Sequence, residues 1–190
     1  MMYHIIVAMC INNGIGYKNS LPWKLSSDLK YFSKLTKGNG NNAIIMGRKT
    51  WESLPRKPLY GRDNLILTRS TQLPNQQTFS SVDEVIKHCK ERNYSEIWVI
   101  GGEEIYNEFL KKHIISKLYI THINEAFKCD SFFPTINYSE WNVESEEDVK
   151  TENLTYKRKV YVSNQSMDYQ KCPSHNNDAV YLHNQLENKH

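Results

Sequence analysis

The chain has 190 residues, a length that suits one domain with a substantial hydrophobic core and is short for two ordinary domains. Hydrophobic residues make up 39% of it and charged residues 24%, which is typical of a soluble globular protein and excludes a disordered or membrane-embedded one. The net charge of +3 is too small to indicate a nucleic acid partner, and four scattered cysteines without metal or disulfide spacing favour a reducing, cytoplasmic location.

The first predicted element is a buried strand over residues 3–10. The apolar run at residues 5–11 has the length of a strand and is too short to span a membrane. No basic segment precedes it, so it does not resemble a signal peptide. Residues 12–20 are polar and contain two glycines, which predicts a long, mobile loop.

Residues 25–35 predict a helix with an acid on its apolar side. Leu25, Phe32 and Leu35 recur at helical spacing, and Asp28 lies three residues after the first and four before the second. Because a buried, unpaired carboxylate is costly, it should be neutralised or meet a polar partner, such as a ligand with N–H donors. The alternative is a solvated acid in the first helical turn, where acids are favoured. This segment alone leaves both interpretations open.

Strands and helices alternate along the following residues. Predicted strands are 43–46, 64–68, 96–100 and 117–123, predicted helices are 47–54, 82–89 after a capping box at 81–84, and 103–110, and two β-rich segments follow at 140–149 and 153–162. This order predicts an α/β fold whose largely parallel sheet is covered on both faces and ends in an antiparallel pair. We expect one domain over residues 1–163 and a polar, flexible tail over residues 164–190.

Two strand–helix junctions have the composition of phosphate sites. Gly101 and Gly102 follow a strand directly, so the backbone there can approach a pyrophosphate closely. Tight turns also use Gly-Gly pairs, and the acids Glu103 and Glu104 disfavour a phosphate unless their side chains turn away.

The second junction, at Gly47, is followed by Arg48 and Lys49, two cations at a helix N-terminus, where the helix dipole disfavours them. Arg69 is a third cation at the same edge of the sheet, since it follows the strand ending at Thr68. Each could be a solvated surface residue, but their shared position favours a dinucleotide with an additional phosphate, NADP rather than NAD.

Taken together, the motifs resemble dihydrofolate reductase over residues 3–162. The resemblance rests on segments 6–8, 13–16, 21–23, 46–51 (Met-Gly-Arg-Lys-Thr-Trp), 61–62, 100–106 (Ile-Gly-Gly-Glu-Glu-Ile-Tyr) and 130–134 (Asp-Ser-Phe-Phe-Pro), together with Asp28. It implies a mostly parallel eight-stranded sheet with an antiparallel C-terminal edge strand and flanking helices. It also implies a monomer that reduces dihydrofolate with NADPH, by hydride transfer to C6 and protonation at N5, without a metal.

The resemblance also implies roles for individual residues. Asp28 matches the carboxylate that binds N3 and the 2-amino group of the pterin, and Ser131 matches a hydroxyl residue that hydrogen-bonds this carboxylate. Trp23 resembles a tryptophan that holds an ordered water, Arg62 the arginine that binds the α-carboxylate of the glutamate tail, and Tyr106 a tyrosine beside the nicotinamide. The loop over residues 13–23 resembles a lid over the cofactor.

Two further sets of residues follow from the resemblance. The substrate-binding set adds Ile6, Val7, Ala8, Leu29, Phe32, Leu54, Leu59 and Ile100. The cofactor-binding set is Ala8, Ile15, Gly16, Gly47, Arg48, Lys49, Thr50, Thr68, Arg69, Ile100, Gly101, Gly102, Glu103, Glu104, Ile105 and Tyr106. Leu29 stands where many relatives have an aromatic residue.

Two other functions compete with this interpretation. A riboflavin-pathway reductase shares the fold and the use of NADPH, but it would require neither Asp28 nor Arg62. A non-catalytic folate- or RNA-binding module is the other, and NADPH turnover with dihydrofolate discriminates between them.

Overall fold

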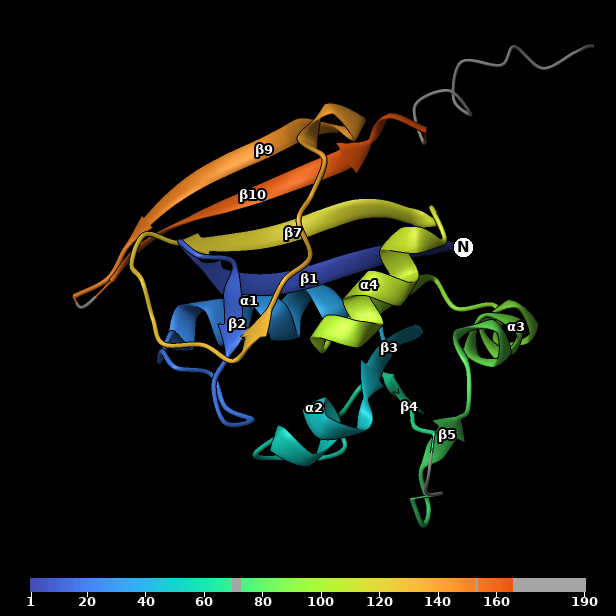
Figure 1. Cartoon of the computed structure of the whole chain (residues 1–190). Coiled ribbons are helices and arrows are strands. Elements are labelled where there is room, and N and C mark those ends of the chain that lie inside the picture. The colour runs from blue at the N-terminus through green and yellow to red at the C-terminus, as the bar shows by residue number, and fades with distance from the viewer. Residues whose placement is uncertain (70–72, 153, 166–190) are drawn as a thin grey trace, which may run out of the picture.

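An eight-stranded sheet forms the centre of the molecule in the computed structural model, which describes residues 1–69, 73–152 and 154–165 (Figure 1). In spatial order its strands are β5 (Gln77–Phe79), β4 (Asp63–Leu67), β3 (Asn42–Gly47), β6 (Glu96–Val99), β1 (Met2–Cys10), β7 (Ile115–Ile123), β10 (Thr155–Ser163) and β9 (Trp141–Lys150). The first six are mutually parallel, and β10 is antiparallel to both of its neighbours. The predicted parallel sheet with an antiparallel C-terminal strand is confirmed, and β9 forms its edge.

The shortest strands carry no local signal in the sequence. β5 has three residues and no apolar run, so nothing in its composition marks it as a strand. The segment predicted to be only a loop contains β2 (Gly14–Gly16), which pairs with β8 (Ser131–Phe132) in a separate two-stranded sheet. That prediction is therefore wrong for β2, whose pairing depends on a partner more than a hundred residues away.

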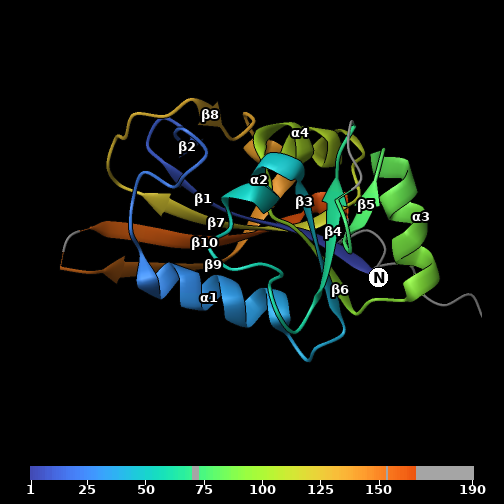
Figure 2. The same cartoon turned by 90° about the horizontal axis from the view of Figure 1, so that it is seen from below.

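Helices cover both faces of the large sheet. Helix α1 (Ser26–Lys37) lies on one face, and α3 (Val82–Arg92) and α4 (Glu103–Lys111) lie on the other (Figure 2). Helix α2 (Arg48–Ser53) follows β3, and a 3-10 turn, η1 (Tyr138–Glu140), precedes β9. The predicted cap at Ser81 is present, since its hydroxyl accepts from the backbone N–H of Glu84 at 3.2 Å.

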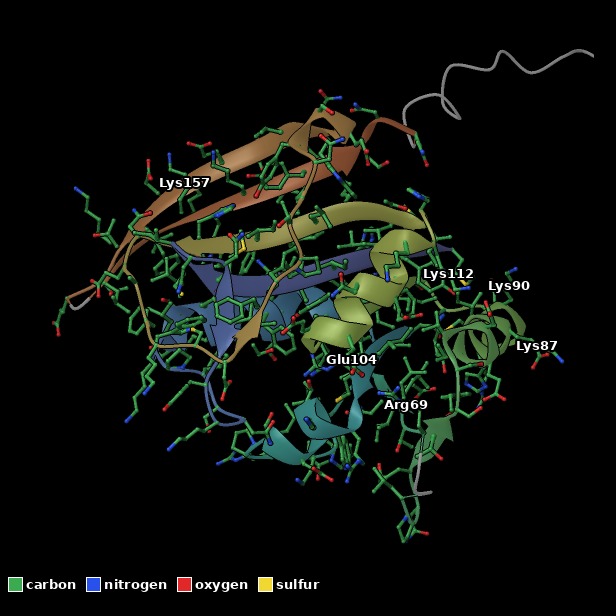
Figure 3. The ribbon with its side chains drawn as sticks, viewed as in Figure 1. Arg69, Lys87, Lys90, Glu104, Lys112 and Lys157 are labelled. Carbon is green, nitrogen blue, oxygen red and sulfur yellow. The ribbon has the colours of Figure 1, made fainter. Side chains whose placement is uncertain are left out.

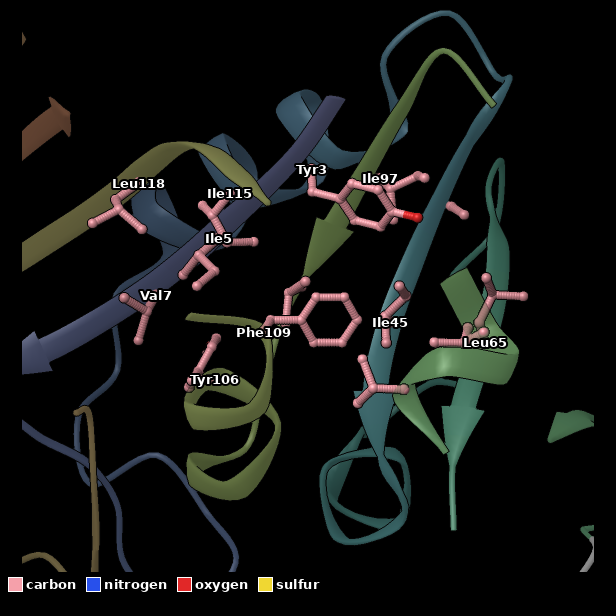
Figure 4. Packing of buried hydrophobic residues seen from close by; sticks show 14 of the residues in the cluster. Tyr3, Ile5, Val7, Ile45, Leu65, Ile97, Tyr106, Phe109, Ile115 and Leu118 are labelled. Atoms are coloured by element: carbon pink, nitrogen blue, oxygen red, sulfur yellow. The ribbon is translucent and has the colours of Figure 1, made fainter. Parts of the chain in front are cut away.

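The side chains of β1 alternate between two cores. Ile5 and Val7 join the cluster beneath α3 and α4, where Phe109 and Tyr106 pack against the sheet (Figure 4). Ile6 lies in a different cluster, with Phe32 of α1. Because successive residues of a strand point to opposite faces, the even positions of β1 face the helix that carries Asp28.

Most of the predicted tail, residues 166–190, lies outside the described residues. Asn164 is described, and its side-chain amide donates to the carbonyl of Ser139 at 2.9 Å and accepts from Asn142 at 2.6 Å. In the part of the chain that the structure covers, no helix is long and apolar enough to cross a membrane.

Candidate active site

Asp28 lies in the first turn of α1 with its carboxylate turned towards the sheet. Its side chain is 16% exposed, so the alternative of a solvated acid is wrong. The hydroxyl of Thr121 donates to its Oδ1 at 2.6 Å, and Nε of Arg158 lies 3.9 Å from the same oxygen. Burial raises the pKa of Asp28, while the Thr121 hydrogen bond and the nearby guanidinium oppose that rise.

The hydroxyl partner of Asp28 is Thr121, and the expectation that Ser131 takes this place is wrong. Ser131 lies on β8, and its hydroxyl donates to Glu103 at 3.3 Å. Thr121 lies on β7, directly beneath α1. Its position becomes apparent only from the register of the sheet, because 93 residues separate it from Asp28.

The register places the neighbours of Asp28 in one row across four strands. Ala8 of β1 pairs with Thr121 of β7, Thr121 pairs with Arg158 of β10, and Arg158 pairs with Glu147 of β9. Sequence reasoning missed both Thr121 and Arg158. Arg158 has a signal in the sequence, because it is a cation at a position that alternates in step with Tyr156 and Val160, on the apolar side of the strand.

Most apolar residues of the predicted substrate-binding set lie together and form an apolar wall. Ile6, Phe32, Leu54, Leu59 and Ile100 belong to one cluster, which also contains Trp51. Two members of the predicted substrate-binding set do not join it. The side chain of Val7 packs on the opposite face of the sheet, and Leu29 is 57% exposed.

Ala8 and Trp23 belong to a neighbouring cluster on the same side of the sheet. The Trp23 ring is buried and packs edge-on against Phe127, with ring centroids 5.4 Å apart. Its indole therefore has a fixed orientation beside the start of α1.

Arg62 lies at the far end of the same wall. It donates to the carbonyl of Ser33 at 3.2 Å and to the hydroxyl of Thr36, and its guanidinium carbon lies 5.7 Å from the Phe32 ring. Its Nε is buried without a partner among the described residues. These contacts place Arg62 at the C-terminal half of α1, whereas Asp28 lies in the first turn of that helix. Residues of the apolar wall therefore lie between Arg62 and Asp28.

The two predicted glycine junctions meet at the ends of adjacent strands. The N–H of Gly47 donates to the carbonyl of Gly101 at 2.8 Å, and a Cβ at Gly102 would lie 3.5 Å from the Thr50 hydroxyl. A Cβ at Gly47 would approach Ile105 within 3.1 Å. The two junctions therefore form one continuous backbone surface, and side chains of α4 lie against Gly47 and Gly101.

Tyr106 fixes this surface to β1. Its buried hydroxyl donates to the carbonyl of Ile6 at 3.0 Å, and burial raises its pKa, so the hydroxyl stays protonated as a donor. The aromatic ring of Tyr106 lies directly against Gly101, so helix α4 packs on the glycine junction that precedes it.

Two of the predicted phosphate-binding cations, Arg69 and Arg48, form ion pairs with acidic residues. Arg69 pairs with Glu104 at 2.9 Å, between exposed side chains (Figure 3). Arg48 pairs with Glu52 at 3.0 Å, and Lys49 is exposed. Such exposed pairs are weak, so a phosphate can displace the acids.

Two further features suit an anion at this edge. The side chain of Glu103 turns towards β8, where its Oε2 accepts from the N–H of Phe132 at 2.9 Å. The Thr68 hydroxyl is buried without a partner among the described residues. Of the two acids that disfavoured a phosphate, Glu103 is thus engaged elsewhere and Glu104 pairs with Arg69, and a polar group remains to be satisfied.

The pairing of β2 with β8 fixes the positions of Ile15 and Gly16. Gly16 accepts from the N–H of Asp130 at 3.0 Å, and Ile15 packs against the cluster that contains Tyr106. The predicted lid is therefore attached to the segment that follows β7.

Comparison with known proteins identifies the family. The family model for dihydrofolate reductase matches residues 2–165. A dihydrofolate reductase of Aedes albopictus is 37% identical over 178 residues, which are 84% of this chain and 96% of that protein. The corresponding protein of Heliothis virescens is 36% identical over 176 residues, covering 83% and 95% of the two chains. That of Buchnera aphidicola is 41% identical over 145 residues, covering 75% and 84%.

Proposed function

The chain belongs to the dihydrofolate reductase family, and we propose that Asp28 is the carboxylate that binds the substrate in its active site. The activity is the NADPH-dependent reduction of dihydrofolate to tetrahydrofolate, a step of one-carbon metabolism. The observation that carries the proposal is the buried carboxylate of Asp28, which the sheet orients through Thr121.

The buried carboxylate suits a ligand with adjacent N–H donors. N3 and the 2-amino group of a pterin offer two such donors, and hydrogen bonds to an ionised acceptor are stronger than neutral ones. Little water surrounds this charge, so its attraction for a protonated pterin is less screened than in solution. Asp28 thereby favours the cationic form of the substrate, which accepts a hydride more readily. We further propose that a water held near Trp23 carries the proton to N5.

The apolar wall and Arg62 suit the aminobenzoyl and glutamate parts of the substrate. Phe32, Leu54 and Leu59 offer apolar contacts for an aminobenzoyl group. The guanidinium of Arg62 is fixed by its hydrogen bonds to α1, which suits it to bind the α-carboxylate of a glutamate. An acid site and a cation site along one wall suit a substrate with a pterin at one end and a carboxylate at the other.

The glycine junctions suit the cofactor. Gly101 and Gly102 lead directly into the N-terminus of α4, and Arg69 lies at the same edge of the sheet together with the Thr68 hydroxyl, which has no partner among the described residues. When bound, NADPH supplies the hydride. The protein orients the two ligands and excludes water from the reacting atoms.

We also propose that the protein acts in the cytoplasm as a monomer. Cys10, Cys89 and Cys129 are free thiols, which is typical of a reducing compartment.

The decisive experiment is turnover by Asp28→Asn, measured by the loss of NADPH absorbance with dihydrofolate. The amide keeps the size of the side chain but removes its charge, so we expect kcat to fall by on the order of a thousandfold. Activity should recover in part at low pH, where the substrate arrives protonated. Asp148→Asn makes the same change at an exposed position and should leave turnover unchanged. Unchanged turnover in Asp28→Asn would refute the assignment.

A second experiment tests the role of Arg62. Because a charge-assisted hydrogen bond is worth about 1.5–3 kcal/mol, Arg62→Leu should raise KM for dihydrofolate by about 10- to 100-fold. KM for NADPH should stay near its original value. Arg56→Leu, at an exposed position, is the matched control. An equal rise in both KM values would contradict binding of the glutamate tail by Arg62.

A further inference from the structure

Arg158 is a cation buried beneath the first turn of α1. Its side chain is 13% exposed, and its Nη2 donates to the carbonyl of Ser27 and to the hydroxyl of Tyr156, each at 3.2 Å. The ring of Tyr31 lies 4.3 Å from the guanidinium carbon. These contacts fix the plane of the guanidinium, so the direction of each of its N–H groups is determined.

The Nε of Arg158 is buried without a hydrogen-bond partner among the described residues, and it lies 3.9 Å from Oδ1 of Asp28. A buried donor without a hydrogen bond is costly, and a buried carboxylate needs a compensating charge. Each group therefore supplies what the other lacks, and a small movement of Asp28 brings them into hydrogen-bond distance.

The other acid near Arg158 does not account for its burial. Glu147 lies 3.3 Å from Nη1, but its side chain is 63% exposed. Ion pairs with an exposed partner contribute about 0–1 kcal/mol, which is far less than the cost of burying a guanidinium. Asp28 is the acid near Arg158 that is itself buried.

We propose that Arg158 is a positioning residue for Asp28: from β10 it holds the carboxylate in its charged form and orients it towards the substrate. The proposal rests on the proposed function of Asp28. In this arrangement Thr121 and Arg158 hold the carboxylate from the side of the sheet, so that its remaining acceptor sites are available to N–H donors of the pterin.

The charged and titratable groups around Asp28 determine the expected pH dependence. They are Arg158 and Tyr156 on β10, Tyr31 on α1, and Glu147 on β9 behind the guanidinium. Thr121 on β7 does not titrate. Arg158 is the cation of this set, so its removal leaves the burial of Asp28 uncompensated.

The test measures the pKa of Asp28 by carbon NMR of its carboxyl group, identified by its absence from Asp28→Asn. Because an opposite charge at this distance shifts a carboxyl pKa by about one pH unit or more, Arg158→Met should raise the pKa of Asp28 by that amount. Arg158→Lys retains the charge and should give a smaller rise. Lys159→Met, on the opposite face of the same strand, is the matched control and should give none.

Steady-state kinetics provide a second readout. Both Arg158 variants should raise KM for dihydrofolate more than they lower kcat, and KM for NADPH should not change. An equal rise in both KM values would indicate general damage and would overturn the positioning role. So would a pKa of Asp28 that is the same in Arg158→Met as in the unmodified protein.

Two safeguards keep the test decisive. If Arg158→Met does not fold, Arg158→Lys carries the test, because it also lacks the Nε donor, and an unchanged KM for dihydrofolate would overturn the proposal. The NMR titration needs no turnover. Its failure is therefore distinct from failure of the proposed function, which turnover by Asp28→Asn decides.

Discussion

Asp28 is placed where its charge opposes folding. Burial raises its pKa above 3.8, so the folded state binds a proton more readily than the unfolded state does. The free energy of unfolding therefore falls as pH rises from about 3.8 through the pKa of the folded state. At neutral pH the ionised carboxylate lowers stability, because Thr121 and Arg158 offset only part of the cost of its burial.

Asp28→Asn should consequently raise Tm at neutral pH while it abolishes turnover. The amide oxygen can still accept from Thr121, and each 1 kcal/mol gained raises Tm by about 2–4 °C in a protein of this size. The difference from the unmodified protein should vanish below pH 3.8, where Asp28 is protonated in both states. Thermal unfolding at several pH values measures it, and a lower Tm of the variant at neutral pH would contradict this account.

Single residues of the site were predictable when their signal was local. Helical spacing places Asp28 on the apolar side of its helix, and the other motifs then favour a role in binding over a solvated acid. Thr121 has no local signal, because only the register of β7 brings it beneath α1. Ser131 was chosen in its place from a motif, and the pairing of β8 with β2 directs its hydroxyl towards Glu103 instead.

At the scale of elements, the turn from β6 into α4 depends on Gly101. This residue has φ of 113°, a conformation that side chains with a Cβ rarely adopt. A Cβ there would also lie 3.1 Å from the ring of Tyr106. The strand, the glycine turn and the helix are thus mutually dependent.

Gly101→Ala should lose stability and NADPH affinity together. Backbone strain of this kind costs about 1–3 kcal/mol, and the displaced ring disturbs the hydrogen bond from Tyr106 to Ile6. Gly40→Ala is a close control, because Gly40 also has a positive φ, of 93°, but its Cβ would meet nothing within 4 Å. Chemical denaturation and NADPH titration of both variants measure the difference. Equal losses would contradict a role for the Tyr106 contact.

The long elements were predictable and the short ones were not. The predicted helix at 25–35 and the strand at 3–10 correspond to α1 and β1 within two residues at each end. Their own sequence specifies them, the helix through its apolar repeat and the strand through a continuous apolar run. β5 and β2 have three residues each, and their neighbours in the sheets determine their conformation.

At the scale of the whole molecule, the C-terminal limit of the folded domain can be tested by truncation. Removal of residues 166–190 should leave Tm and turnover unchanged, because that segment has few large apolar residues. Removal of 164–190 also deletes the hydrogen bonds of Asn164 to Ser139 and Asn142, and should lower Tm by about 2–4 °C. A large loss from the shorter truncation would show that the domain extends beyond residue 165.

The order of strands in the sheet has a consequence for synthesis on the ribosome. β1 is made first, but its two neighbours, β6 and β7, are made only after β3, β4 and β5. The carboxylate of Asp28 gains its contact with Thr121 only after β7 has been made, and its contact with Arg158 only after β10, the last strand, has been made. A nascent chain that lacks β10 exposes the unpaired edge of β7 and an unsupported acid. A chain whose translation stops before β10 is therefore a substrate for chaperones and proteases, and it is not a shorter active enzyme.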